Sequence, residues 1–337
     1  MPLSQTIKTK LETAQTIALF WHENIDGDAL GSMYGLWLQL EKLGKKIWYF
    51  TPDQPSPLFS FLDISTLQTT FDYGKYDLIV LLDMNHPLRM KNFYKDHEEY
   101  FDQAETIIID HHLPEPIPAL PHATIFADDT AIAACELVYE LTTARRKEKN
   151  LMDERIATFL YMGMTSDSGN FRHDEAYQTT RLMENALWAI KQGANKQAVI
   201  NNLFRNKSYE DLAFMQHILA RMQKQEDICY SRYTKAELAD SWLHRDSADY
   251  ALYLMVDVRT AQLIILGKET DEGIRISFRG KGKYNTRELA AHFGGGGHFN
   301  ASGCTIPSSG NMQQDMEAFI KQIQTILPTV TTPIAQS

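Results

Sequence analysis

Short aliphatic runs alternate with helical patterns through the first half of the chain. The runs cover residues 16–21, 46–50, 78–82, 106–109 and 123–126. Two of them, 78–82 and 106–109, are continuously apolar, which is typical of strands buried on both faces of a parallel sheet. The helical patterns cover residues 29–43, 131–145, 154–162 and 177–191. This repeated order predicts an α/β domain with a doubly wound, mainly parallel sheet.

The pattern changes after Gly193, which ends the last of these helices. Residues 194–226 are mostly polar and permit helix, so we expect a helical linker there. Further on, strand patterns cover 228–233, 251–258, 262–267 and 273–278, and helical patterns cover 286–292 and 312–326. We therefore predict a first domain over residues 1–193, a linker over 194–226 and a smaller α+β domain over 227–330.

Composition narrows the class of protein. The chain has 337 residues, of which 44% are hydrophobic, and this excludes a disordered or low-complexity protein. The formal net charge of −10 argues against a protein that coats long nucleic acids, because phosphate binding needs an excess of Lys and Arg. A short or small phosphorylated substrate stays compatible with this charge.

No targeting or cross-linking signal is found. The 3 cysteines are too scattered for a disulfide framework or a zinc site. Residues 1–15 lack the apolar core of a signal peptide, and the run at 78–82 is far too short to span a membrane. We expect a soluble, cytoplasmic protein without a membrane partner.

Carboxylates and histidines gather just beyond the ends of the predicted strands and of one helix. Ligands of open α/β sheets bind outside the carboxyl ends of the strands, so side chains at these positions are expected to meet at one edge. A single Asp there is often only a helix cap, but an ordered set of such positions favours a shared site. The side chains in question are His22, Asp26, Asp28, Asp83, Asp110, His111, His112 and Asp167.

This set predicts a metal centre. Five carboxylates close together repel one another unless cations neutralise them. Oxygen and imidazole ligands without thiolate suit Mn²⁺ or a similar divalent ion better than a structural zinc. The number of ligands favours two ions about 3.5–4 Å apart, which can stabilise the attacking and leaving oxygens of phosphoryl hydrolysis. Asp83, alone at its strand end, is the natural bridging ligand.

Four dispersed segments resemble the motifs of the DHH phosphoesterases. They are His22-x-x-x-Asp26-x-Asp28-Ala-x-Gly31-Ser32, then Asp83, Asp110-His111-His112 and Thr165-Ser-Asp167-Ser-Gly169. The later segment Gly294-Gly-Gly-Gly297-His298-x-x-Ala301-Ser302-Gly303 resembles the signature of the associated DHHA1 domain. The resemblance spans almost the whole chain and is strongest to the short branch of oligoribonucleases and pAp phosphatases, the nanoRNases.

The resemblance implies a role for each residue of the centre. His22, Asp26 and Asp83 would hold one ion, and Asp28, Asp83, His111 and Asp167 the other. His112 would face the scissile phosphate and donate to its oxygen or to the leaving group, while Asp110 would orient a ligand histidine. Mn²⁺ is the first choice, with Mg²⁺ or Co²⁺ as alternatives, and water activated by the two ions would be the nucleophile.

The glycine run of the second domain lets the backbone approach a ligand closely and offers N–H groups to an anion. Around it, five basic residues against Glu288 give a local balance of +4 over residues 275–298. An ordinary solvated hairpin is the alternative. By resemblance, this basic segment would bind the terminal nucleotide and phosphate, although Arg279-Gly280 replaces the family's usual Arg-Ser pair. The residues expected to contact it are Arg279, Asn285, Gly295, Gly296, Gly297 and His298.

We therefore predict an enzyme, a metal-dependent phosphoesterase that hydrolyses very short oligoribonucleotides to mononucleotides. It would also remove the 3′-phosphate of 3′-phosphoadenosine 5′-phosphate (pAp). Hydrolysis of cyclic di-AMP or of a linear dinucleotide is the alternative. Pyrophosphate or polyphosphate hydrolysis and a catalytically silent nucleotide-binding module are weaker ones. No residue separates these substrates, and because family members are often dimers, a homodimer also stays open.

Overall fold

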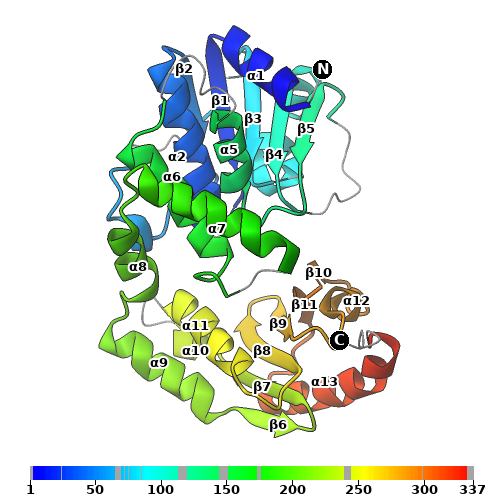
Figure 1. Ribbon diagram of the computed structural model, residues 1–337. Coiled ribbons are helices and arrows are strands. Elements are labelled where there is room, and N and C mark those ends of the chain that lie inside the picture. Colours follow the sequence, from blue (N-terminus) through cyan, green and yellow to red (C-terminus); the bar gives the residue numbers. More distant parts are fainter. Residues whose placement is uncertain are drawn as a thin grey trace. The chain divides into compact units, whose positions relative to one another are not determined.

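The computed structural model of the chain consists of two compact units, Met1–Asn206 and Lys207–Ser337 (Figure 1). Helix α8 (Lys196–Phe204) falls in the first unit and α9 (Tyr209–Ala220) in the second. The partition into 1–193, 194–226 and 227–330 stays a prediction. The structure describes the whole chain apart from residues 1–2, 24, 65–69, 72, 75, 85, 113–119, 144–150, 173–175, 239–243, 298 and 332–337.

Five parallel strands form the sheet of the first unit, in the order β2-β1-β3-β4-β5. Every position of β3 and β4 is buried, which explains their continuous aliphatic sequence. The predicted doubly wound parallel sheet is confirmed, with each strand within one residue of its expected bounds. The strands are β1 (Thr16–Trp21), β2 (Lys46–Phe50), β3 (Leu78–Leu82), β4 (Thr106–Asp110) and β5 (Ala123–Ala127).

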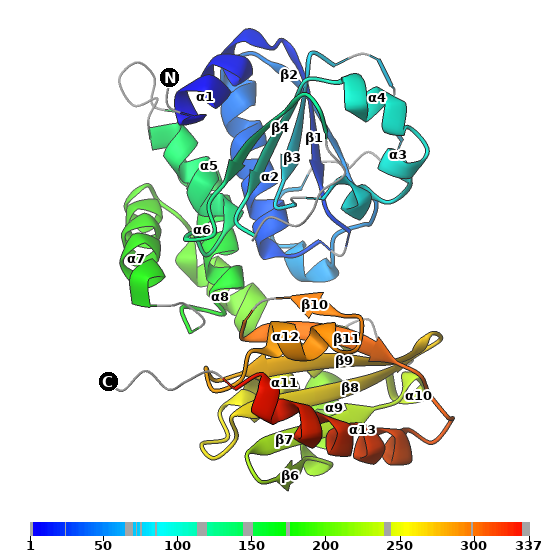
Figure 2. The same cartoon turned by 90° about the vertical axis from the view of Figure 1, so that its right-hand side faces the viewer.

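Helices cover both faces of this sheet (Figure 2). The short helices α3 (Asn92–Lys95) and α4 (Glu98–Gln103) lie on one face, over an aromatic core that includes Phe20 and Phe101. Alternation along β1 sends Ile17, Leu19 and Trp21 to the opposite core. The helices on that side are α1 (Leu3–Thr13), α2 (Gly27–Lys42), α5 (Ala134–Thr143), α6 (Glu154–Asp167) and α7 (Ala176–Lys191).

Glycines allow α2 and α6 to pack closely side by side. A Cβ on Gly31 would lie 2.5 Å from the carbonyl oxygen of Phe159, and one on Gly35 would lie 2.6 Å from Leu160 Cδ2. The two helices run in opposite directions, since Gly27 at the start of α2 lies against Ser166 near the end of α6. Their packing therefore brings the start of α2 and the end of α6 to the same place.

The sheet of the second unit is mixed, in the order β10-β11-β9-β8-β7-β6, and only the β7–β8 pair is parallel. Helix α13 (Met312–Ile326) packs on one face through Phe319 and Ile323, and α9 and α11 (His244–Val256) pack on the other. Two short helices are α10 (Lys235–Leu238) and α12 (Thr286–Ala291). The strands are β6 (Gln223–Gln225), β7 (Ile228–Tyr233), β8 (Leu263–Thr270), β9 (Gly273–Gly280), β10 (Gly296–Gly297) and β11 (Ala301–Ile306).

The predicted strand over residues 251–258 is wrong, because α11 covers most of this segment. Ala248, Ala251, Leu252 and Met255 are buried at a helical spacing, while Leu254 is 44% exposed. Elements that were not predicted include α1, α3, α4, α10, β6, β10 and β11. Helix α6 continues to Asp167 instead of ending at residue 162.

Among the described residues, no helix combines the length and the apolar composition that crossing a bilayer requires.

Candidate metal centre

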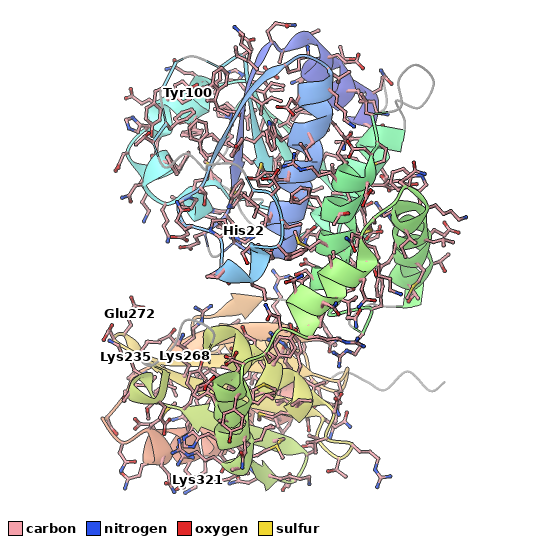
Figure 3. All side chains as sticks on the ribbon, turned by 90° about the vertical axis from the view of Figure 1, so that its left-hand side faces the viewer. His22, Tyr100, Lys235, Lys268, Glu272 and Lys321 are labelled. Atoms are coloured by element: carbon pink, nitrogen blue, oxygen red, sulfur yellow. The ribbon has the colours of Figure 1, made fainter. Side chains whose placement is uncertain are left out.

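The strand order places a topological switch point at the carboxyl ends of β1 and β3. From β1 the chain continues to β2 on one side and then returns to β3 on the other, which is the switch point where open α/β sheets bind ligands. Trp21 pairs with Leu82, and Leu82 pairs with Ile109, so the residues that follow in each strand lie side by side. These residues are His22, Asp83 and Asp110, and Figure 3 labels His22 at this end of the sheet.

His22, Asp26 and Asp83 form the first ligand group. His22 Nε2 lies 3.2 Å from Asp83 Oδ2 and 3.9 Å from Asp26 Oδ2. Asp26 is the N-cap of α2, where its Oδ1 accepts from the N–H groups of Asp28 and Ala29. His22 Nδ1 lies 2.5 Å from the carbonyl oxygen of Glu23 and must donate to it, so Nε2 is the nitrogen that can bind a cation.

Asp28, His111 and Asp167 form the second ligand group. His111 Nε2 lies 3.8 Å from Asp28 Oδ2 and 3.4 Å from Asp167 Oδ2. Asp28 stands in the first turn of α2 and Asp167 is the last residue of α6, so the close packing of these helices brings them together. In each of the two groups, one ligand atom per residue lies within 4.8 Å of the others.

Asp83 lies between the two groups. Its Oδ2 faces His22, and its Oδ1 lies 3.3 Å from His111 Nε2. The backbone of Asp83 has a φ of 56°, a left-handed conformation that is uncommon for residues other than glycine. Directly after β3 ends, the carboxylate therefore faces the two histidines. One carboxylate oxygen is thus available to each group, as a bridging ligand requires.

Asp110 fixes the position of His112. Its Oδ1 accepts from the His111 backbone N–H at 2.9 Å and from His112 Nδ1 at 2.7 Å. The resemblance led us to expect that Asp110 orients a ligand histidine. In the structure, the ring that it binds is that of His112, and it contacts His111 through the main chain. The catalytic and ligand roles of these residues stay predictions.

The donor atoms fit divalent cations. Asp83 Oδ1 and His111 Nε2 are buried, and although they lie 3.3 Å apart, neither atom forms a hydrogen bond, which is costly unless a ligand binds them. Burial lowers the pKa of His22, but the hydrogen bond to Asp83 and the negative charge of Asp83 outweigh burial and raise the pKa of His22 to about 9. Burial raises the pKa of the nearby Cys135 thiol well above its usual value, which keeps a thiolate out of the donor set. A divalent cation that accepts oxygen and imidazole ligands would satisfy these atoms.

Two contacts at this centre were not anticipated from the sequence. The backbone N–H groups of Ala134 and Cys135, at the start of α5, donate to the Asp28 carboxylate. Arg89 Nη1 lies 3.5 Å from the carbonyl oxygen of Asp83, and none of the described carboxylates forms an ion pair with it. Backbone N–H donors cannot be recognised in a sequence. The only sequence indication for Arg89 was its position a few residues after Asp83.

A row of outward side chains on β9 forms the surface on which the resemblance places the substrate. Ile274, Ile276 and Phe278 are buried, so the alternate residues Arg275, Ser277 and Arg279 point away from that core. Beside them on β11, Gly303 pairs with Ser277 and Ala301 with Arg279. Arg279 therefore has the small Ala301 beside it on β11, whereas its neighbour on β8 is Ile264.

The glycine run forms the edge strand β10, which pairs with Gly303 and Ser302 of β11. A Cβ on Gly295 would collide with the carbonyl oxygen of Gly303, and one on Gly297 would lie 2.6 Å from that of Ala301. A Cβ on Gly294 or on Gly296 would meet no atom of the described residues within 4 Å. Gly295 and Gly297 are therefore required by strand packing, whatever ligand they also contact.

The other predicted substrate contacts differ in what surrounds them. Asn285 is the N-cap of α12, and its side-chain oxygen accepts from the Glu288 N–H. Lys283 forms an ion pair with Asp227 at 2.5 Å, so part of the positive charge of this segment is neutralised within the unit. His298 lies outside the described residues.

Replacement of Gly163 by Ala is expected to weaken the second ligand group. The added Cβ would lie 2.6 Å from Asp28 Oδ1 and would collide with Cys135 Sγ. We expect the free energy of unfolding to fall by about 1–3 kcal/mol and Mn²⁺ affinity to fall about 10-fold or more. The double variant G163A/C135A should regain stability but not affinity, because Asp28 stays displaced. Calorimetric Mn²⁺ titration and thermal unfolding separate the two effects, and wild-type affinity in G163A would contradict the prediction.

Two family models match the chain. The model described as "DHH family, N-terminal domain" matches residues 16–164, and the model described as "DHHA1 domain" matches residues 234–328. The first match contains both ligand groups except Asp167, which follows just after its end. The second contains the β9–β11 surface.

Curated relatives cover most of the chain at modest identity. The "bifunctional oligoribonuclease and PAP phosphatase NrnA" of Mycoplasma genitalium is 26% identical over 325 residues, which cover 91% of this chain and 93% of the relative. The protein of the same name from Thermus thermophilus is 27% identical over 292 residues, which cover 85% of this chain and 82% of the relative.

Solved structures share the fold. An exopolyphosphatase-related protein from Bacteroides fragilis superposes with a TM-score of 0.83 at 23% identity, covering 97% of each chain. RecJ from Thermus thermophilus in complex with Mn²⁺ superposes with a TM-score of 0.54 at 13% identity, covering 98% of this chain and 55% of that one. At such identities, both comparisons describe the fold alone.

Proposed function

Because the chain belongs to the DHH family of phosphoesterases, with a DHHA1 domain after the DHH domain, we propose that it hydrolyses very short oligoribonucleotides to mononucleotides and also dephosphorylates pAp. Membership makes it a hydrolase of phosphate esters. The observation that carries the proposal is the position of Asp83, which offers one carboxylate oxygen to each of two ligand groups. Such an arrangement suits a pair of divalent ions.

The proposed ligands follow the two groups. His22, Asp26 and Asp83 would hold one ion, and Asp28, His111 and Asp167 would hold the other, with Asp83 shared. When bound, two divalent ions would supply positive charge to the phosphate and lower the pKa of the attacking water. Mn²⁺ is the proposed ion, since carboxylate and imidazole without thiolate are ligands that it accepts.

Protein groups would complete the chemistry. Asp110 accepts a hydrogen bond from His112 Nδ1, so any proton that this ring gives to the leaving oxygen comes from Nε2. The guanidinium of Arg89 would bring further positive charge to the edge of the centre, where a phosphate is attracted. The His112 ring is held by a short contact of 2.7 Å, and Arg89 lies at the longer distance of 3.5 Å from the carbonyl oxygen of Asp83.

Two observations favour a short substrate. The curated relatives from Mycoplasma genitalium and Thermus thermophilus are named as oligoribonuclease and PAP phosphatase. The chain carries a net charge of −10, and the cationic row on β9 is limited to Arg275 and Arg279. An acidic surface with a small basic region disfavours a long polyanion and admits a substrate with few phosphates.

A substrate panel with Mn²⁺ tests the proposal. RNA oligomers of 2 to 24 nucleotides, pAp and cyclic di-AMP would be incubated with metal-free protein and with protein reloaded with Mn²⁺. We expect the di- to tetranucleotides to be hydrolysed at least about 100-fold faster than the 24-mer, with pAp also turned over and no activity before reloading.

Three outcomes of the same panel would contradict parts of the proposal. Rapid opening of cyclic di-AMP without hydrolysis of short RNA would replace the proposal by a cyclic-dinucleotide phosphodiesterase. Equal rates on all lengths would contradict the preference for short RNA, and full activity in metal-free protein would contradict the metal centre.

A further inference from the structure

The direction of the Asp28 carboxylate is set by the start of helix α5. Asp28 is fully buried. Its Oδ2 accepts from the Ala134 N–H at 2.5 Å, and its Oδ1 accepts from the Cys135 N–H at 3.0 Å. Both oxygens are therefore bound by consecutive backbone amides, and a shift of this helix terminus would turn the carboxylate with it.

Glu136 fastens the turn that carries these amides. Its Oε1 accepts from the Ile132 N–H at 2.8 Å, and its Oε2 accepts from Asn185 Nδ2 at 2.7 Å. The Glu136 side chain is only 1% exposed, although a buried carboxylate is unfavourable without partners. Asn185 belongs to α7, so Glu136 links the start of α5 to that helix.

Arg181, one turn before Asn185 on α7, contacts both Glu136 and Asp128, which lies a few residues before the same turn. Its Nη1 donates to Asp128 Oδ2 at 2.7 Å, and its Nε lies 3.8 Å from Glu136 Oε2. The Asp128 N–H donates to the Asp110 carbonyl oxygen at 3.1 Å. Residues 128–136 are thus held between the end of β4 and α7.

We infer that Glu136, anchored by Asn185, is a positioning residue for the metal centre, which holds the Ile132–Cys135 turn so that two amides fix Asp28 for metal binding. The inference rests on the proposed role of Asp28 as a ligand. Hydrogen-bond partners of metal ligands typically change metal affinity 10- to 100-fold when they are removed. Glu136 acts one step further out, through the backbone, and is expected at the lower end of this range.

Three variants of α5 isolate this role. Glu136→Leu removes the acceptor of the Ile132 N–H, whereas Glu136→Gln keeps a carbonyl oxygen that can accept it. Glu140→Gln is the matched control, because Glu140 lies one turn further along α5 and binds the same arginine, with Oε1 2.6 Å from Arg181 Nη2. If the Glu136→Leu variant does not fold, Asn185→Ala serves as the test in its place.

Metal affinity is measured by calorimetric titration of metal-free full-length protein with Mn²⁺, and thermal unfolding is followed separately. We expect Glu136→Leu to weaken one of two binding events about 10-fold, and Asn185→Ala to weaken it about 3-fold. We expect Glu136→Gln and Glu140→Gln to stay within about 2-fold of wild type. A folded Glu136→Leu variant with wild-type affinity would overturn the inference, as would an equal loss in Glu140→Gln.

This experiment also separates the inference from the proposed function. If wild-type protein binds Mn²⁺ and the variants behave as expected, but no RNA or pAp is hydrolysed, the inference stands and the substrate proposal fails. If wild-type protein binds no Mn²⁺, Asp28 is not a ligand and the inference falls with the metal centre.

Discussion

Replacement of Asp83 by Asn is expected to lower hydrolysis of a dinucleotide by more than about 10³-fold, since the loss of one oriented electrostatic group in an active site already costs 10²–10³. The two carboxylate oxygens of Asp83 face His22 and His111, and the amide would present an N–H₂ group to one of these histidines. It would also remove the negative charge that both ligand groups share. We expect the variant to lose both ions or to bind them without a shared ligand.

The fold should survive this change, because Asn tolerates the left-handed backbone conformation that Asp83 adopts with a φ of 56°. The measurements are turnover, metal content after dialysis and thermal unfolding. Asp77→Asn is the matched control at the opposite end of the same strand, where Asp77 Oδ2 accepts from the Gln15 and Thr16 N–H groups. A D83N variant that retains two ions and wild-type turnover would refute the bridging role.

The positions of the candidate ligands could be predicted because they follow from strand order. Each parallel strand of the first unit is a short, buried aliphatic run, and its carboxyl end is fixed where the run stops. His22, Asp83 and Asp110 each come at such an end, so their meeting required no knowledge of side-chain packing. Asp167 was found just beyond the helical pattern of residues 154–162, although helix α6 extends further than this pattern and includes Asp167.

Contacts that depend on packing could not be predicted. The amides that hold Asp28 come from the start of α5, and the predicted helix began at residue 131 instead of Ala134. The segment 251–258 was mistaken for a strand because its apolar residues are nearly continuous, whereas burial of Ala251, Leu252 and Met255 at helical spacing becomes visible only against β8.

Glycine and charge patterns show the same limit. Gly31 is part of the resemblance, but the structure gives it a packing role against Phe159. In the second unit, the balance of +4 over residues 275–298 included Lys283, which pairs with Asp227 outside that window. The acidic total, in turn, includes the five carboxylates of the candidate metal centre, so the surface that a substrate meets is acidic but less so than the net charge of −10 indicates.

Replacement of His112 by Asn is expected to lower turnover of a dinucleotide by about 10²–10⁴-fold if the ring protonates the leaving oxygen. The Asn side chain can place an N–H₂ group where His112 Nδ1 stands, 2.7 Å from Asp110 Oδ1, and it removes the ring atom Nε2. Metal affinity should change little, because His22, Asp26, Asp28 and Asp167 keep their positions. The expected defect is therefore in kcat.

The leaving group distinguishes the two roles open to His112. A nitrophenyl ester of a nucleotide has a leaving oxygen that departs without a proton, so loss of a general acid should lower its hydrolysis by less than about 10-fold. A group that only stabilises charge on the phosphoryl oxygens would be missed equally by both substrates. Equal losses would therefore assign His112 to phosphate binding, whereas a large loss confined to the dinucleotide would establish proton transfer to the leaving group. Unchanged turnover of both substrates would remove His112 from the catalytic centre.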